Sequence, residues 1–391
     1  MVDPSVEIAG ISFRNPVIVA SSPAARSSKH IVKCIRSGAG GVVTKTITYD
    51  PTQRIQPKPR MHVVNPKDAL AGRFYSFYSV DLMSELEPEA WVKELAKAKK
   101  EVGNDGVLIA SIAGRTYGEW EKLAALMQGA GADMLELNLS CPHIDEGGLM
   151  GKAASYDAEI VSNVAKAVKG SASIPVIGKL TPQGANPVLL ARTMASSGID
   201  AVVSTARFQG LLIDTESGKP VLWPGFGGYG GPWQVPISVA WTAHIAMEGL
   251  GKPIIGSGGI SKWQDALSFI LAGASAIQLC TSIMTKGYGV IEDIEKGIEG
   301  WLEKNGFGSL KEAVGMSLKG IVPLEKLERS KVYRVTVNDG KCTRCGICEK
   351  ICPYDAITIV SKGVVIDWKA CDNCNLCVSL CPTSAMSLLR F

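Results

Sequence analysis

Short apolar runs alternate with longer amphipathic segments along most of the chain. The short runs are rich in β-branched residues, a composition typical of strands that are buried on both faces. Segments between them, such as EAWVKELAKAKKEVG from Glu89, carry apolar residues three and four positions apart and predict helices. The eight strand-like runs are PVIVASS from Pro16, GGVVTKT from Gly40, GVLIASI from Gly106, ADMLELNLS from Ala132, PVIGKL from Pro175, AVVSTA from Ala201, PIIGSGG from Pro253 and AIQLCTS from Ala276.

This repeated order of strand and helix predicts an α/β fold of the (β/α)8 type, a TIM barrel. A doubly wound sheet is the competing architecture. Loop lengths favour the barrel, because the long stretches 49–88, 141–156 and 207–234 all follow strands. They therefore gather on one face, the face at which such barrels carry their active sites.

The apolar periodicity fades after Leu302, and a cysteine-dense segment begins near Lys331. We therefore predict a barrel domain over residues 1–315, a linker over 316–332 and a small α+β domain over 333–391.

Composition narrows the class of protein. The chain has 391 residues, of which 46% are hydrophobic, and its formal net charge of +4 is too small to indicate a nucleic-acid-binding protein. The first residues lack the pattern of a signal peptide, and no apolar segment is long enough to span a membrane. A cytoplasmic location is expected. In that reducing compartment the eleven cysteines favour metal binding or redox chemistry over disulfides.

Eight of the cysteines form two runs of the same spacing, the second 29 residues after the first. Such runs hold iron–sulfur clusters, and in two-cluster ferredoxins the fourth cysteine of each run binds the other cluster. A pair of zinc sites is the alternative, although zinc sites usually separate two Cys-x-x-Cys pairs. We expect one [4Fe-4S] cluster on Cys342, Cys345, Cys348 and Cys381, and another on Cys371, Cys374, Cys377 and Cys352. Such a tail would relay single electrons.

Strands seven and eight end in the glycine-rich turn 256–260 and in Cys280-Thr281-Ser282. Backbone amides after these two strands commonly hold a phosphate in barrels, although a tight turn alone also requires glycine. Lys45, Asn138 and Lys179 end inner strands, where a charged or amide group needs a partner. A bound anionic or heteroaromatic ligand is expected there, and a salt-bridged core lysine is the alternative.

No strand–GxGxxG–helix unit is present in the sequence, so a nicotinamide dinucleotide is not expected to bind by that motif. Single-electron clusters beside a phosphate-bearing ligand suggest FMN, which collects two single electrons and passes on a hydride.

The motifs VIVASSPA, GVVTKT, ADMLELNLSCPH, IGKLTP, IIGSGGI and AIQLCTS, followed by the ferredoxin-like tail, resemble the FMN-binding, dihydroorotate dehydrogenase-like barrel of the dihydropyrimidine dehydrogenases. The resemblance spans nearly the whole chain. It implies that the FMN ring is contacted by Ala20, Ser21, Lys45, Asn138, Lys179, Thr205 and Gly231. It implies that the FMN phosphate is held by Gly258, Gly259, Cys280 and Thr281.

In that family a hydride passes between the flavin and one carbon of an activated C=C bond, while a side chain on the loop after strand four exchanges a proton with the other carbon. The cysteine that does so in dihydropyrimidine dehydrogenases corresponds to Ala154 here. The candidate catalytic residues are therefore Ser155, Cys141 and Lys179. Further candidates on the same loop are His143, Asp145, Lys152 and Tyr156.

The resemblance implies substrate contacts by Ser79, Asp81, Asn138, Ser140 and Arg207. Two of these depart from the family. Ser79 stands in place of an asparagine, and Arg207 ends the triplet Thr205-Ala206-Arg207, which is usually Thr-Asn-Thr, so an amide is lost and a cation is gained. Amides read the edge of a pyrimidine, whereas an arginine reads a carboxylate or phosphate. An anionic substrate is therefore one hypothesis. The alternative is that Arg207 turns outward and pairs with Asp214 or Glu216.

We expect an FMN and iron–sulfur oxidoreductase that acts on the C=C bond of a small molecule. Its electron partner would be an NAD(P)H-oxidising flavoprotein subunit or a ferredoxin, and the chain would form a homodimer or a hetero-oligomer. No nucleic acid or membrane is expected as a partner. The alternatives are a non-catalytic electron-transfer subunit and a zinc protein on an unrelated barrel.

Overall fold

The computed structural model describes residues 2–141, 149–222, 225–329 and 333–390. The chain divides into two compact units, which we call the barrel unit (Met1–Gly320) and the cysteine-rich unit (Ile321–Phe391). The division falls within the stretch expected as a linker. Each unit is described by itself.

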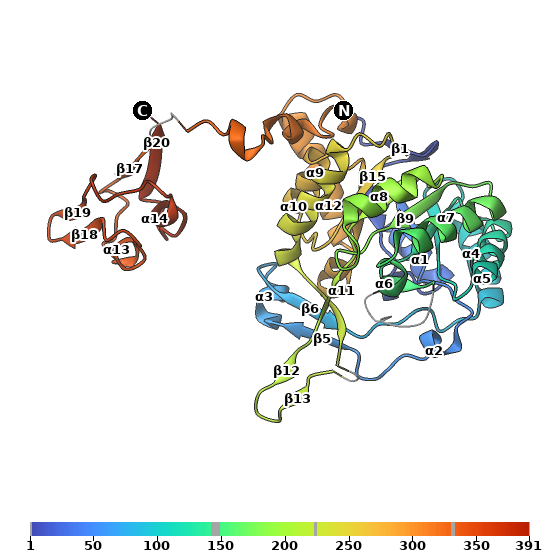
Figure 1. The fold of residues 1–391 in the computed structure, drawn as a ribbon. Coiled ribbons are helices and arrows are strands. Elements are labelled where there is room, and N and C mark those ends of the chain that lie inside the picture. Colours follow the sequence, from blue (N-terminus) through green and yellow to red (C-terminus); the bar gives the residue numbers. More distant parts are fainter. Residues whose placement is uncertain (1, 142–148, 223–224, 330–332, 391) are drawn as a thin grey trace. The chain divides into compact units, whose positions relative to one another are not determined.

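Eight parallel strands close into a barrel in the order β3, β4, β7, β8, β9, β10, β15 and β16, and β16 pairs with β3 (Figure 1). A closed barrel has no edge strands, so the doubly wound sheet is excluded and the predicted TIM barrel is confirmed. Each predicted strand run contains one barrel strand. The strands are β3 (Val17–Val19), β4 (Gly41–Val43), β7 (Val107–Ile112), β8 (Met134–Asn138), β9 (Val176–Lys179), β10 (Ala201–Ser204), β15 (Ile254–Ser257) and β16 (Ala276–Leu279).

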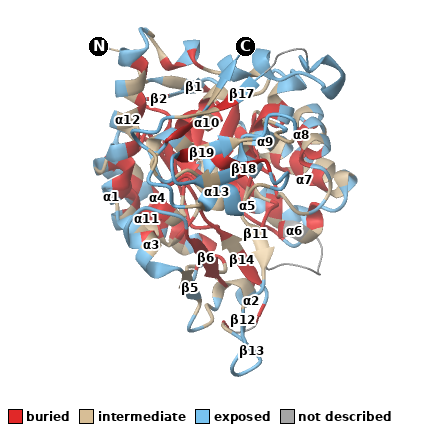
Figure 2. Cartoon of the chain, turned by 90° about the vertical axis from the view of Figure 1, so that its left-hand side faces the viewer, coloured by how far each residue is buried: buried red, intermediate tan, exposed pale blue. Residues whose placement is uncertain are grey.

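Helices surround the barrel, and buried residues concentrate in the strands and on the inner faces of the helices (Figure 2). Helix α7 (Ala158–Ser171) illustrates the cause: it buries Val161, Val164, Ala165 and Val168 completely, and these residues recur at helical spacing on one face. The carboxylate of Asp157 accepts a hydrogen bond from a backbone amide of its first turn. The outer helices are α1 (Ser28–Arg36), α4 (Pro88–Val102), α5 (Tyr117–Gly129), α7 (Ala158–Ser171), α8 (Pro187–Ser196), α9 (Val235–Met247), α10 (Trp263–Leu271) and α12 (Val290–Lys304).

A hairpin closes the amino-terminal end of the barrel. It consists of β1 (Val6–Ile8) and β2 (Ile11–Phe13). Its Ile8 and Phe13 pack in one apolar cluster with inward-facing strand residues such as Ile18 and Val203. Only the carboxyl ends of the strands are therefore left for a ligand site.

A second sheet, which the sequence did not predict, is built from two of the long loops. It is antiparallel, with the order β11-β14-β6-β5. Strands β5 (Met61–Val64) and β6 (Ser76–Ser79) come from the loop after the second barrel strand, whereas β11 (Phe208–Gly210) and β14 (Gly227–Gly230) come from the loop after the sixth. Between them, β12 (Ile213–Asp214) and β13 (Lys219–Pro220) form a short arm (Figure 1). Short helices in the barrel unit are α2 (Pro51–Arg54), α3 (Pro66–Leu70), α6 (Gly151–Ala154) and α11 (Thr281–Lys286).

The cysteine-rich unit is an α+β structure with an internal repeat. Left-handed backbone conformations occur at Arg344, Gly346 and Asp355, and again 29 residues later at Asn373, Asn375 and Ser384. The two halves therefore follow the same path around their cysteines. Its elements are β17 (Tyr333–Val337), α13 (Ile347–Lys350), β18 (Ile357–Val360), β19 (Gly363–Ile366), α14 (Leu376–Ser379) and β20 (Met386–Arg390), with β17 paired to β20 and β18 to β19.

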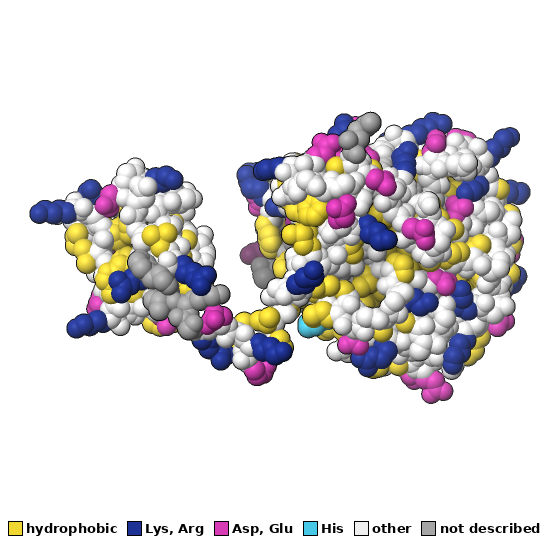
Figure 3. Space-filling view, turned by 90° about the horizontal axis from the view of Figure 1, so that it is seen from above, with side chains coloured by type: hydrophobic (Ala, Val, Ile, Leu, Met, Phe, Trp, Pro, Cys, Tyr) yellow, Lys and Arg dark blue, Asp and Glu magenta, His cyan; other side chains and the backbone are white. Residues whose placement is uncertain are grey.

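Acidic and basic side chains are interspersed on the face of the molecule that Figure 3 shows. Among the described residues, no helix combines the length and the apolar character that crossing a bilayer requires.

Candidate active site and cluster sites

A cavity opens at the carboxyl ends of the barrel strands. The empty space within the cavity and its open mouth together is about 1040 Å³. The residues that the resemblance assigns to the flavin all line it: Ala20, Ser21, Lys45, Asn138, Lys179, Thr205, Gly231, Gly258, Gly259, Cys280 and Thr281. So do the expected substrate residues Ser79, Asp81, Ser140 and Arg207.

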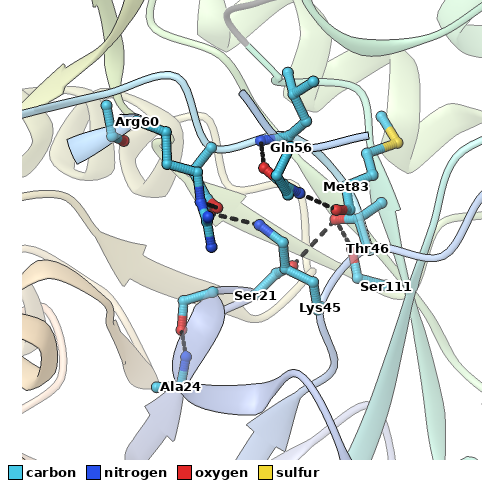
Figure 4. Close-up of polar contacts among 12 residues, drawn as sticks. Ser21, Ala24, Lys45, Thr46, Gln56, Arg60, Met83 and Ser111 are labelled. Carbon is cyan, nitrogen blue, oxygen red and sulfur yellow. Dashed lines mark hydrogen bonds and ion pairs between the residues drawn. The ribbon is translucent and has the colours of Figure 1, made fainter. Parts of the chain in front are cut away.

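Lys45 is held by a buried carboxylate. Its Nζ lies 2.5 Å from Asp81 Oδ2, both side chains are 9% exposed, and Arg60 Nε lies 3.3 Å from Asp81 Oδ1. Burial raises the pKa of Asp81, but Lys45, Arg207 and Arg60 outweigh burial and hold that pKa below its ordinary value. Asp81 is therefore ionised at neutral pH and orients the Lys45 ammonium group. Lys45 and Arg60 are drawn in Figure 4.

Lys179 belongs to a second buried network. Its Nζ donates to Gln278 Oε1 at 2.7 Å and to Glu136 Oε1 at 3.3 Å, and Gln278 Nε2 donates to Glu136 Oε2 at 2.5 Å. Both lysines thus have carboxylate partners, as the salt-bridge alternative proposed, and both also line the cavity. Glu136 and Gln278 were missed from the sequence. The available signal was that Glu136 precedes Asn138 by two residues on β8 and so shares its face.

Hydroxyl groups fix the amide of Asn138. Its Nδ2 donates to Thr46 Oγ1 at 2.9 Å. Figure 4 shows the Thr46 hydroxyl, which lies 3.1 Å from Ser21 Oγ and 3.0 Å from Ser111 Oγ. Ser140 Oγ donates to the amide oxygen at 3.3 Å. The side chain is therefore oriented before any ligand binds.

The turn after β15 depends on two glycines. Gly258 and Gly259 have φ values of +119° and +80°, which other residues rarely adopt. A Cβ on Gly258 would also collide with Gln234 and Ser238. In α11, which follows β16, the fully buried Ser282 Oγ has no hydrogen-bond partner among the described residues, but Ser282 does not line the cavity. A glycine turn that lines the same cavity as two lysines fits a flavin phosphate and ring.

The structure does not bring Ser155 to the cavity. Ser155 is fully buried and donates its hydroxyl hydrogen to the carbonyl of Leu139, while Ala154 is fully buried in α6. Cys141 does line the cavity and is 8% exposed. Tyr156 is 59% exposed and does not line it. His143 and Asp145 lie outside the described residues, as does the side chain of Lys152.

Arg207 turns into the cavity. Its Nη1 donates to Ser79 Oγ, and its guanidinium group lies so close to Gly228 that a Cβ there would collide with it. The Asp214 carboxylate instead accepts the backbone amides of Glu216 and Ser217, each at 2.9 Å. The outward pairing with Asp214 is therefore not observed.

The cysteine-rich unit has two cavities. Cys342, Cys345, Cys348 and Cys381 line one, which we call the first cluster site, and Cys352, Cys371, Cys374 and Cys377 line the other, the second cluster site. These are the two crosswise sets expected from the spacing. The fourth cysteine of each run accepts a backbone amide four residues on: Ala385 N lies 3.2 Å from Cys381 Sγ, and Ala356 N lies 3.4 Å from Cys352 Sγ. Such amides stabilise cluster-bound thiolates.

The Asp81 network leads to a stability prediction. Asp81→Asn should lower the free energy of unfolding at pH 7 by about 3 kcal/mol, because it leaves Lys45 buried without its charge partner. In the wild type this contribution is complete above the ordinary carboxyl pKa of 3.8 and is lost as the pH falls through the lower folded-state value. Urea unfolding at pH 7 and pH 3 measures both effects. Equal wild-type and variant stabilities at pH 7 would contradict the prediction.

Comparison with known proteins identifies both units. Residues 4–302 match the family described as dihydroorotate dehydrogenase, and residues 341–385 match a 4Fe-4S dicluster domain. The chain is 34% identical over 360 residues to the NAD-dependent dihydropyrimidine dehydrogenase subunit PreA of Escherichia coli (strain K12), covering 90% of this chain and 86% of the relative. It is 36% identical over 314 residues to the catalytic subunit of dihydroorotate dehydrogenase B (NAD(+)) of Pyrococcus abyssi, covering 80% and 99%.

These matches confirm the family resemblance inferred from the sequence motifs. They favour iron–sulfur clusters over the zinc alternative, because the tail itself matches an iron–sulfur domain. The chain therefore belongs to the dihydroorotate dehydrogenase family and is a flavin- and iron–sulfur-type oxidoreductase that acts on CH–CH groups.

Proposed function

We propose that this enzyme reduces or oxidises the activated C=C bond of a small anionic molecule, with FMN in the barrel cavity and two [4Fe-4S] clusters in the cysteine-rich unit. The single observation that carries the anionic substrate is the inward orientation of Arg207.

The cavity residues have distinct roles in this proposal. Lys45 and Lys179 supply positive charge at the flavin ring, Asn138 supplies an oriented amide, and the turn at Gly258 and Gly259 holds the phosphate. When bound, FMN supplies a group that takes up single electrons and exchanges a hydride. Of the candidate catalytic residues, Cys141 and Lys179 line the cavity, and Lys179 donates a hydrogen bond to the buried Glu136.

The negative charge proposed for the substrate is inferred from the partners of the cationic side chains in the cavity. The two oxygens of Asp81 already bond to Lys45 and Arg60, and Arg207 bonds to the neutral hydroxyl of Ser79. The guanidinium charge of Arg207 is therefore available to a ligand, and its planar fork matches a carboxylate or a phosphate. The two asparagine positions that the resemblance assigns to pyrimidine recognition are occupied here by Ser79 and by Ala206, which precedes Arg207.

Electron delivery follows from the two sets of thiols. Two clusters would pass single electrons to the flavin, which requires a donor. Relatives named as NAD-dependent or as subunits support an NAD(P)H-oxidising flavoprotein subunit as that donor, with a ferredoxin as the second candidate. The chain forms a homodimer or a hetero-oligomer in this proposal. A cytoplasmic location fits the eight cluster cysteines, because thiols remain reduced in that compartment.

An anaerobic mixing experiment tests the proposal. The purified protein should be brown-yellow and contain about eight irons per FMN. After reduction with dithionite it is mixed with uracil, thymine, orotate and non-cyclic unsaturated carboxylates while the flavin absorbance is followed. Reoxidation by carboxylates but not by uracil or thymine is expected. Reoxidation by none of them would favour the alternative of a non-catalytic electron-transfer subunit.

A further inference from the structure

The two cluster sites differ at positions that the internal repeat makes equivalent. A shift of 29 residues relates Thr343 to Asp372, Arg344 to Asn373 and Tyr354 to Thr383. Because the fourth cysteines are exchanged between the runs, Arg344 and Thr383 line the first cluster site, whereas Asp372, Asn373 and Tyr354 line the second.

The first cluster site presents a donor and a positive charge. Thr383 Oγ1 lies 3.7 Å from Cys381 Sγ, within hydrogen-bonding range of a sulfur atom. The guanidinium group of Arg344 is anchored by a 2.8 Å hydrogen bond to the carbonyl of Ser361. Both groups stabilise additional negative charge on the cluster.

The second cluster site presents acceptors and a negative charge. Asn373 Oδ1 accepts the backbone amide of Val335 at 3.3 Å, and its Nδ2 donates to the carbonyl of Cys371 at 3.5 Å, so the side-chain orientation is fixed. That orientation directs the amide oxygen, 3.7 Å away, toward Cys371 Sγ. Asp372 adds a carboxylate on the same loop.

The second cluster site also has no counterpart of the Thr383 hydroxyl beside its fourth cysteine, Cys352, among the described residues. Tyr354 stands where the repeat places Thr383 in the other half, and its hydroxyl lies 3.2 Å from Asp372 Oδ2. Cys352 therefore keeps its backbone amide donor, but in the part of the chain that the structure describes it has no side-chain donor like that of Cys381.

Each one-electron reduction adds a negative charge to a thiolate-bound cluster, and hydrogen bonds to sulfur and nearby charges set the reduction potential. We infer that the cluster at the first site has the higher reduction potential. It is therefore the first to be reduced, and electron transfer from the second site to the first is thermodynamically favourable. This ordering rests on the two clusters of the proposed function. Thr383, Arg344, Asp372 and Asn373 act as tuning residues that bind no iron.

A potentiometric titration with dithionite and mediators, followed by electron paramagnetic resonance, tests the ordering in the full-length protein. The wild type should show two separate one-electron midpoints. Asp372→Asn should raise only the lower midpoint, and Thr383→Val should lower only the higher one. Each should change the reduction equilibrium about three- to tenfold, where a tenfold change in a one-electron couple is about 59 mV.

The repeat provides a matched control. Thr343→Asp places the carboxylate of Asp372 at the equivalent position of the first site, so it should lower the higher midpoint. Iron content distinguishes a failure of the predicted order of potentials from a failure of the proposed function, which requires both clusters. Coincident wild-type midpoints with about eight irons bound, or a shift of the higher midpoint in Asp372→Asn, would overturn the ordering alone. Absence of either cluster from the wild type would overturn the proposed function.

Discussion

Replacing Arg207 by asparagine should lower kcat/KM for a carboxylate substrate on the order of 30- to 1,000-fold. Losing one partner of a desolvated, hydrogen-bonded charge pair costs about 2–4 kcal/mol, which corresponds to this range. The variant should keep its flavin, because the expected flavin contacts lie on other residues. Steady-state kinetics of the reoxidation of reduced protein, with the flavin content of each preparation measured in parallel, checks both statements.

Two further variants make this result specific. Arg207→Lys keeps the charge but loses the planar fork, so its activity should fall between those of the wild type and Arg207→Asn. The triple variant Ser79→Asn/Ala206→Asn/Arg207→Thr carries an asparagine at both expected positions and removes the cation, so it should gain activity with uracil or thymine. Unchanged carboxylate kinetics in Arg207→Asn would show that the arginine does not contact the substrate.

The barrel strands could be predicted because each is a continuous apolar run buried on both faces, such as Val107–Ile112. The cysteine sets could be predicted because ligand spacing in ferredoxins is local and repeated. For each strand the information lies within a few consecutive residues, and for the cysteine sets it lies in two short runs whose spacing repeats after 29 residues. Tertiary structure then adds little that the local pattern does not already contain.

The mouth of the cavity could not be predicted in the same way. Its sheet joins β6 to β14, and the register places Gly228 opposite Ser79. Arg207 reaches Ser79 across Gly228, so the contact depends on a glycine and on pairing between two loops that are far apart in sequence. Short strands such as Gly227–Gly230 have no apolar periodicity that would reveal them.

The buried polar partners of the cavity lysines could not be predicted from the sequence either. The resemblance singled out Lys179, but its partners Glu136 and Gln278 lie on two other strands, and barrel closure brings them together. Ser155 is the reverse case, a residue that was expected at the site but does not line the cavity. A hydroxyl near the expected acid position looked reactive, but its use by the Leu139 carbonyl depends on the path of the backbone around α6.

The crosswise assignment of the fourth cysteines predicts an unusual pattern of iron loss. Cys381→Ser should remove the cluster of the first run, Cys342 to Cys348, and leave the cluster of its own run intact. About half of the iron, roughly four atoms, should therefore be lost. Iron analysis and electron paramagnetic resonance of the reduced protein measure the loss.

A double variant distinguishes this arrangement from binding within each run. In Cys342→Ser/Cys381→Ser both changes fall on the first cluster site, so the protein should still hold about four irons. If Cys381 instead belonged to its own run, both clusters would be damaged and little iron would remain. Cys34→Ser is the control: this thiol is buried in the barrel, donates to the carbonyl of Ala24 and has a pKa that burial raises to about 12. Its replacement should leave the iron content unchanged, so a loss limited to Cys381 would reflect cluster ligation and not the general effect of removing a thiol.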